Sequence, residues 1–385
     1  MNIYELHEKF RKYLYIENPH LLDITIASYI TKELIGDPLW LFPVATTGYG
    51  KSEISKSITA LGEECNVKMM DQTTAKAFAS GKRGEAPHRQ GTVPSAQGQD
   101  IGAWLQNKMA LLVFPDLANL LSTVEEEKMA VFAVFRTMFD GYIIRDTGYD
   151  SPHYSHIHTN ILAFSTPALK RDTGIYSLMG TREILYSLPK IRHPELMDEK
   201  NITDEQRNEL AMDVKRFIGL IGMSPWIDPN EETKTKIKSL AKRIAVWRAE
   251  GITDDYGYLI DNVETEVPKR LYVQLTKLWK GLKRMGLEEK DIMNILAEIE
   301  SGSGNKIRMA IYRLLTLGEN EEGEIVEEPR DSTLGAISKE LNIGADEIRR
   351  QLMILRGLKM VELHAESTVK DLYGVKSRWK GIVGF

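Results

Sequence analysis

The stretch from Leu39 to Leu61 constrains the fold of this chain more than any other. A short apolar run, Leu39–Val44, leads through a glycine-containing loop to Gly50-Lys51-Ser52, and a helical pattern continues to Leu61. A buried strand, such a loop and a helix N-terminus point backbone N–H groups at one place, which suits an anionic phosphate. We expect this segment to bind a nucleotide through Thr47, Gly48, Tyr49, Gly50, Lys51, Ser52 and Glu53.

Each residue of the motif has a chemical role. Lys51 is placed to reach the β- and γ-phosphates, and Ser52 is placed to ligate Mg²⁺. Ala45 stands where the full pattern has its first glycine. The alternative is a glycine turn that opens an ordinary helix, because a short Gly-Lys-Ser sequence also occurs by chance. We favour the nucleotide site, with ATP and Mg²⁺ as the expected cofactors.

Composition limits the other classes of protein. A chain of 385 residues suggests two or three domains, and its net charge of −5 requires any nucleic-acid contact to come from local patches. The single cysteine, Cys65, excludes an intrachain disulfide. No run approaches the ~18 apolar residues of a membrane span, and the N-terminus does not read as a signal peptide. We expect a cytoplasmic protein without a membrane partner.

Apolar runs alternate with helical segments over the first half of the chain. The strand candidates are Leu39–Val44, Val67–Met70, Ala110–Phe114, Asn160–Ser165 and Ile184–Leu188. This alternation predicts an α/β fold with a largely parallel sheet covered on both faces. The predicted parts are an N-terminal helical segment at 1–36, the α/β core at 37–200, a helical region at 201–318, an acidic linker at 319–331 and a compact module at 332–385.

Carboxylates at strand ends are the candidates for metal binding and catalysis. Asp116 follows the apolar strand 110–114, so we expect it at the carboxyl edge of the sheet, where it would hold the Mg²⁺ water shell. Many ATPases have a glutamate next, but here Leu117 follows. Asp71, at the end of the second strand candidate, is one choice for the general base, and Glu53 is another. An acid that caps the following segment explains Asp71 equally well.

Two polar positions and two arginines extend this candidate site. Asn160 and Thr166 lie on the strand candidate at 160–165 and just after it, where they can face the γ-phosphate, although an ordinary buried strand and turn is an equal alternative. Arg182 precedes the last strand candidate and can reach the nucleotide of a neighbouring subunit. Arg270 begins a helix and can contact the γ-phosphate from the helical region.

The C-terminal module predicts a nucleic-acid contact. A helical pattern over 333–344 ends at a glycine turn, a second follows at 345–355, and strand patterns come next, which is the order of a winged helix. Residues 330–385 carry ten Lys or Arg and seven Asp or Glu, so this module is positive while the whole chain is negative. The expected DNA contacts are Arg349, Arg350, Lys376, Arg378 and Lys380. Arg145, on a hairpin of the core, is a further candidate, for which an exposed connecting hairpin is an equal alternative. Docking to a protein is the alternative.

Taken in order, these parts resemble the AAA+ ATPases. The stretches that carry the resemblance are Gly36-Asp-Pro-Leu-Trp40, Gly50-Lys51-Ser52, Asp71-Gln-Thr-Thr74 through Ser80-Gly81, Phe114-Pro-Asp-Leu117, Phe139-Asp-Gly-Tyr142, Gly180-Thr-Arg182 and Glu266-Val-Pro-Lys-Arg270. The chain is similar to poorly characterised ATP-binding proteins of phages, plasmids and integrated elements. It also looks like the motor half of minichromosome-maintenance helicases.

The resemblance implies a P-loop NTPase core with a helical lid and a C-terminal winged helix. It implies an arginine finger at Arg182 and a sensor role for Arg270. The expected activity is ATP hydrolysis by a DNA-acting homo-oligomer, a ring for which a hexamer is one candidate size, in a replicative helicase or a helicase-like motor. A helicase loader or remodeller without unwinding activity is one alternative. A DNA-binding regulator controlled by ATP is another.

Overall fold

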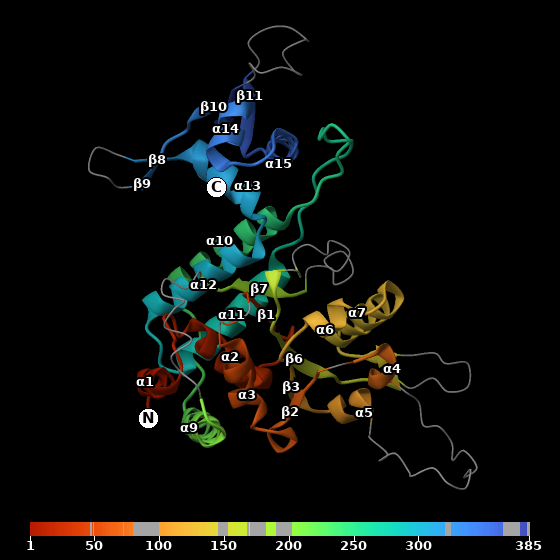
Figure 1. Cartoon of the computed structure of the whole chain (residues 1–385), viewed down its shortest axis with the longest axis vertical. Helices are drawn as coiled ribbons and strands as arrows, with labels where there is room; N and C mark the ends of the chain where they lie inside the picture. Colours follow the sequence, from red (N-terminus) through yellow and green to blue (C-terminus); the bar gives the residue numbers. More distant parts are fainter. Residues whose placement is uncertain are drawn as a thin grey trace, which may run out of the picture. The chain divides into compact units, whose positions relative to one another are not determined.

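The computed structural model divides the chain into two compact units. It describes residues 1–46, 48, 50–71, 73–79, 100–144, 153–167, 169, 182–189, 202–319, 325–364 and 378–382. The first unit comprises Met1–Ile237 and Arg270–Ile299, and the second comprises Lys238–Lys269 and Glu300–Phe385. Figure 1 shows the elements of both units.

A five-stranded parallel sheet forms the centre of the first unit, which confirms the predicted α/β core. Its strands are β1 (Trp40–Val44), β2 (Val67–Met69), β3 (Met109–Phe114), β6 (His158–Ala163) and β7 (Ile184–Ser187). Their order across the sheet is β2-β3-β6-β1-β7, and every neighbouring pair is parallel. Residues of β1, β3 and β6 are almost all buried, because helices cover both faces.

The handedness of the crossovers decides which helices cover which face. After β1 the chain passes through α3 (Lys51–Thr59) to the far edge strand β2. It then returns towards β1 through α4 (Ala75–Phe78) and α5 (Ile101–Leu105), and through α6 (Ala118–Leu121) and α7 (Glu125–Phe139). Crossovers between parallel strands are right-handed. When the chain reverses its direction across the sheet at β2, the connecting helices therefore move to the opposite face of the sheet. Figure 1 shows α3 on one side of the strands and α7 on the other.

Further helices pack around this sheet. They are α1 (Ile3–Tyr13), α2 (His20–Ile30), the short η1 (Thr31–Glu33), α9 (Asp204–Ile221) and α11 (Lys269–Arg284). Residues 21–30 of α2 are all buried, so α2 is a core helix rather than a surface one. Two more helices, α10 (Glu231–Arg248) and α12 (Glu289–Ser303), each begin in the first unit and end in the second.

The second unit combines three helices with an antiparallel sheet. The helices are α13 (Lys306–Thr316), α14 (Leu334–Leu341) and α15 (Ala345–Gly357). The sheet has the order β10-β12-β11, from Asp331–Thr333, Arg378–Gly381 and Val361–His364. Helix α13 packs against α14, α15 and β12, so the unit begins well before the expected boundary at residue 332.

The connecting regions contain structure that the sequence analysis did not predict. Residues 201–318 are not helical throughout, because 249–268 fold as an irregular hairpin with bridges between Glu250 and Glu264 and between Thr253 and Leu259. Turn-forming glycine, aspartate and asparagine residues and a closing proline disfavour helix there. The acidic segment also contains strand structure, since β9 (Ile325–Glu327) pairs with β8 (Leu317–Glu319) and β10 begins at residue 331.

One buried cation joins the parts of the second unit. The Arg308 guanidinium on α13 donates to Gln351 of α15 at 3.1 Å. It also donates to the carbonyl oxygens of Val246, Trp247 and Ala249, at 3.3, 3.1 and 2.7 Å. Burial lowers the pKa of Arg308 to about 10. The guanidinium therefore caps the C-terminus of α10 and fixes the first residues of the hairpin.

Replacing Arg308 tests this role. Arg308→Leu should destabilise the second unit by about 3 kcal/mol, because buried carbonyl groups lose their donor. Arg313→Leu, an exposed position on the same helix, is the matched control and should change the free energy of unfolding little. Calorimetric unfolding of both variants measures the difference, and equal stabilities would contradict the role given to Arg308.

Candidate functional site

The Lys51 side chain lies at the carboxyl edge of the parallel sheet. Gly50 adopts a left-handed conformation, with φ of 67°, directly before α3. The Lys51 ammonium donates to the carbonyl oxygen of Ser165 at 2.8 Å and to that of Ala45. Ala45 follows β1 and Ser165 follows β6. The cation therefore bridges the ends of two neighbouring strands, where ligands bind in open α/β sheets.

Two carboxylates lie at the same edge. Burial lowers the pKa of Lys51, and the charge of Asp116 opposes this shift. Asp116 follows β3, is exposed, and accepts from the N–H of Ala118 at 2.8 Å. Asp71 follows β2 and accepts from the Asn119 amide at 3.1 Å. Lys51 and the carboxylates Asp116 and Asp71 thus lie at the carboxyl ends of neighbouring strands.

The residues present fit a nucleotide phosphate with Mg²⁺. Gly48 and Gly50 have φ of 90° and 67°, backbone conformations that allow a loop to turn N–H groups inward. Ser52 is exposed in the first turn of α3. Thr47 and Tyr49 lie outside the described residues. Among the residues that the structure describes, no group of three or more His, Cys, Asp or Glu could hold a metal alone. Ser52 and Asp116 remain the predicted ligands of Mg²⁺.

Asn160 has a structural position, which corrects its expected role. It is fully buried, and its side chain accepts from Leu39 N–H at 2.8 Å. Its amide donates to the Ser28 carbonyl at 2.8 Å and to the Thr31 hydroxyl at 3.1 Å. The side chain therefore ties β6 to α2 and to the start of β1 instead of facing Lys51. Thr166 lies one residue beyond Ser165 and stays at the Lys51 edge.

Arg182 and Arg270 meet at the opposite edge of the sheet. Their guanidinium carbons lie 5.5 and 5.4 Å from the centre of the Phe139 ring. Phe139 packs edge-on against Trp40, the first residue of β1, at 5.0 Å. Since β1 has five residues, this cluster is about 16 Å from the Lys51 edge. Arg270 is therefore not placed to contact a phosphate bound by Lys51 of the same chain.

Further contacts hold Arg182 in place. Its guanidinium pairs with Asp140 at 3.0 Å, and its side chain is 12% exposed. Its carbonyl oxygen accepts from the Gln274 amide at 2.8 Å, and Gln274 in turn accepts from Trp40 N–H at 3.1 Å. Reasoning from sequence did not find Gln274 or the Phe139 platform. The available signal for Phe139 was its position as an aromatic residue directly before the turn-forming pair Asp140-Gly141.

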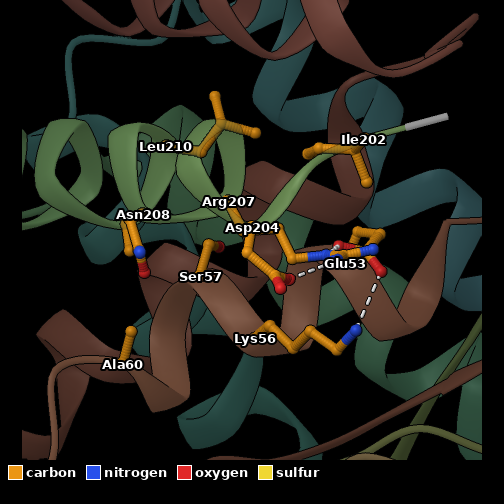
Figure 2. Close-up of a pocket in the computed structure, with 10 residues that line it drawn as sticks. Glu53, Lys56, Ser57, Ala60, Ile202, Asp204, Arg207, Asn208 and Leu210 are labelled. Atoms are coloured by element: carbon orange, nitrogen blue, oxygen red, sulfur yellow. Dashed lines mark hydrogen bonds and ion pairs between the residues drawn. The ribbon is translucent and has the colours of Figure 1, made fainter. Parts of the chain in front are cut away.

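Glu53 contacts α9 rather than the loop. It accepts from Lys56 at 2.9 Å and from Arg207 at 2.7 Å. Burial raises the pKa of a carboxyl group, but these hydrogen bonds outweigh it and lower the pKa of Glu53. Figure 2 shows Arg207 of α9 and Glu53 of α3 together in the lining of the pocket between these helices. The pocket has a volume of about 250 Å³. Glu53 therefore holds α9 against α3 through its ion pair with Arg207.

Two of the expected DNA contacts of the second unit, Arg349 and Arg350, already have acidic partners. Arg349 pairs with Asp346 at 2.9 Å, and Arg350 pairs with Glu347 at 2.8 Å. Arg378 and Lys380 are exposed on β12, and Lys380 stands in register between acidic residues of the neighbouring strands, Asp331 and Glu362. Facing cross-strand neighbours offset its charge. Arg145 and Lys376 lie outside the described residues.

Comparison with known proteins does not identify the chain. No protein-family model matches it, and no characterised protein matches it. Within the described part of the chain, no helix combines the length and apolar character needed to cross a membrane.

The Glu53 ion pairs predict a pH dependence of stability. A carboxylate with a lowered pKa contributes stability above its ordinary value, 4.5, and loses it as the pH falls through its folded-state pKa. Glu53→Gln should therefore be less stable than the parent chain at neutral pH, with the gap closing below 4.5.

Denaturant unfolding over this pH range measures that gap. Glu127→Gln, at an exposed position in the first turn of α7, is the control. Its difference in stability from the parent chain should be smaller than that of Glu53→Gln. A gap for Glu53→Gln that stays constant with pH would contradict the assignment.

Proposed function

We propose that this protein binds ATP with Mg²⁺ at the Lys51 edge, hydrolyses it, and acts on DNA as an oligomeric AAA+ motor, either a replicative helicase or a helicase-like ATPase. The observation that carries the nucleotide site is the Lys51 ammonium at the junction of β1 and β6, within electrostatic reach of Asp116. A half-buried cation beside a helix N-terminus favours a bound polyphosphate.

The residues of this edge have separate tasks in the proposed reaction. Lys51 and the α3 N-terminus would neutralise the β- and γ-phosphates. Ser52 and Asp116 would hold Mg²⁺, which offsets negative charge on the transferred phosphoryl group. Asp71 is the candidate base, because Asn119 positions its carboxylate near the loop that carries Asp116. An exposed carboxylate at this edge can accept a proton from water.

The arginine pair supports an assembly of several copies. Arg182 and Arg270 lie at the amino edge of the sheet, so they would complete the nucleotide site of a neighbouring copy rather than their own. A guanidinium supplied in this way stabilises transition-state charge. A closed ring gives every site the same neighbour, and a hexamer is one size that satisfies this.

A second candidate is a helicase loader or remodeller that uses ATP binding more than rapid hydrolysis. Leu117 favours it: this residue is fully buried, and its N–H donates to the Phe164 carbonyl at 2.8 Å. The position after Asp116 therefore carries no carboxylate to polarise water.

The order of α14, turn, α15 and antiparallel strands supports a winged helix that contacts DNA. The helices α9 to α12 are the candidates for a lid.

Two substitutions test the nucleotide site. Lys51→Ala should lower ATP turnover by at least about a hundredfold, because the phosphates lose their main cation. Asp116→Asn should weaken the Mg²⁺ dependence of turnover with the fold intact. Lys56→Ala, one turn further along α3, is the control and should keep most activity. Parental turnover in Lys51→Ala would remove the proposed site.

Mixing variants tests the arginine. Arg182→Ala should lower turnover by about a thousandfold or more, while the nucleotide affinity of a single chain stays nearly unchanged. Mixtures with Lys51→Ala should regain part of the activity, since one interface then combines intact halves from both variants. Arg136→Ala, an exposed arginine of α7, is the control. If mixed assemblies form without any rescue, Arg182 does not act in a neighbouring site.

A further inference from the structure

Helix α15 is buried around its whole circumference at its centre. Ile348, Leu352 and Leu355 face the core of the second unit, as their spacing predicts. Met353 belongs to the same core cluster and is 8% exposed, whereas Ile354 lies outside that cluster and is still only 4% exposed. The residues from 351 to 355 form an unbroken buried run. A helix that enters a DNA groove needs an exposed face, and the middle of α15 has none.

A hairpin of the same unit provides the cover. We call residues 250–266 the acidic hairpin. A Cβ placed on Gly251 would lie 3.4 Å from the Ile354 side chain, and one placed on Gly357 would lie 2.5 Å from Val263. Its tip glycine, Gly257, lies against the backbone of α15. Close approach through three glycines means that the hairpin packs directly on the helix.

Hydrogen bonds fix the tip of the acidic hairpin on the helix. The Asp254 carboxylate accepts from the N–H groups of Tyr256 and Tyr258, at 2.9 and 2.8 Å. This turn presents the Tyr256 carbonyl oxygen to the Arg349 guanidinium, which donates to it at 3.2 Å. One of the arginines expected to contact DNA is therefore engaged by the hairpin.

The charge of the acidic hairpin opposes nucleic acid. It contains Glu250, Asp254, Asp255, Asp261, Glu264 and Glu266, and no Lys or Arg occurs between Arg248 and Lys269. Phosphates approaching α15 would therefore meet like charge where they need cations. The seated hairpin therefore occupies one face of α15 and brings negative charge to it.

We propose that the acidic hairpin is an intramolecular cover that competes with DNA for α15. The inference rests on the proposed DNA-binding function of the second unit and adds its regulation. With the hairpin seated, α15 is closed to a DNA groove. When the hairpin leaves, Arg349 and the face around Ile354 become accessible, and Arg350 and Arg356 border the exposed helix.

Unseating the hairpin tests the competition. In Gly257→Val, a β-branched side chain would occupy a position with φ of +84°, with its Cβ 3.4 Å from the Asp346 carbonyl oxygen and the Arg350 nitrogen. The tip should lift from the helix. Tyr256→Val is the matched control, because that side chain is 73% exposed and only its backbone carbonyl bonds to Arg349.

The readout is the affinity of the full chain for a fluorescent duplex DNA across a salt series. Gly257→Val should bind the DNA at least about tenfold more tightly than the parent chain. This gain is expected if the acidic hairpin is lifted from α15 in a tenth or fewer of the parent molecules. The salt dependence should become steeper. Adding Arg349→Ala and Arg350→Ala should cancel the gain. Hydrogen exchange on the parent chain should show residues 250–266 becoming less protected when DNA binds.

Other outcomes separate the two proposals. Unchanged or weaker DNA binding in Gly257→Val, together with binding that still depends on Arg349 and Arg350, would overturn the cover and leave the DNA-binding function standing. Greater protection of the hairpin by DNA would also overturn it, because the hairpin would then belong to the DNA-binding surface. No DNA binding by the parent chain or by Gly257→Val would overturn both.

Discussion

The junction of β1 with β6 is the constraint on which the candidate site depends. Only because these strands are neighbours do the Ala45 and Ser165 carbonyl oxygens lie close enough to hold one ammonium. The left-handed Gly50 then sets the direction of α3, so that Lys51 returns to the sheet edge. Strand β3, on the other side of β6, brings Asp116 near the same cation. A change of strand order would separate these groups.

The two ends of β1 have different chemistry. Its carboxyl end carries the lysine and the carboxylates, and its amino end carries Trp40, Phe139 and two guanidinium groups. Gln274 connects the amino end to Arg182 through two hydrogen bonds. Because about 16 Å separates these ends, the arginines cannot serve the Lys51 of their own chain. The proposed need for a neighbouring copy follows from this distance.

The sequence predicted the features that are local to one segment. All five strands of the sheet appear where apolar runs occur, and Asp71 and Asp116 lie at strand ends because acids follow those runs. Asn160 was misread, because its partners at residues 28, 31 and 39 are distant in the sequence. The hairpin at 250–266 was missed for a similar reason: the pattern of α15 reveals its core face, but not which segment covers the other side. Tertiary contacts of this kind leave no periodic signal.

Hydrogen exchange with and without Mg²⁺ and a slowly hydrolysed ATP analogue tests the central claim most directly, because it locates the bound nucleotide in the intact chain. The account predicts increased protection of amides around residues 48–53 and near Asp116, since the loop and the α3 N-terminus would bind the phosphates. Lys51→Ala should lose this protection. Protection confined to the α3–α9 pocket, or none at residues 48–53 under saturating analogue, would contradict the account.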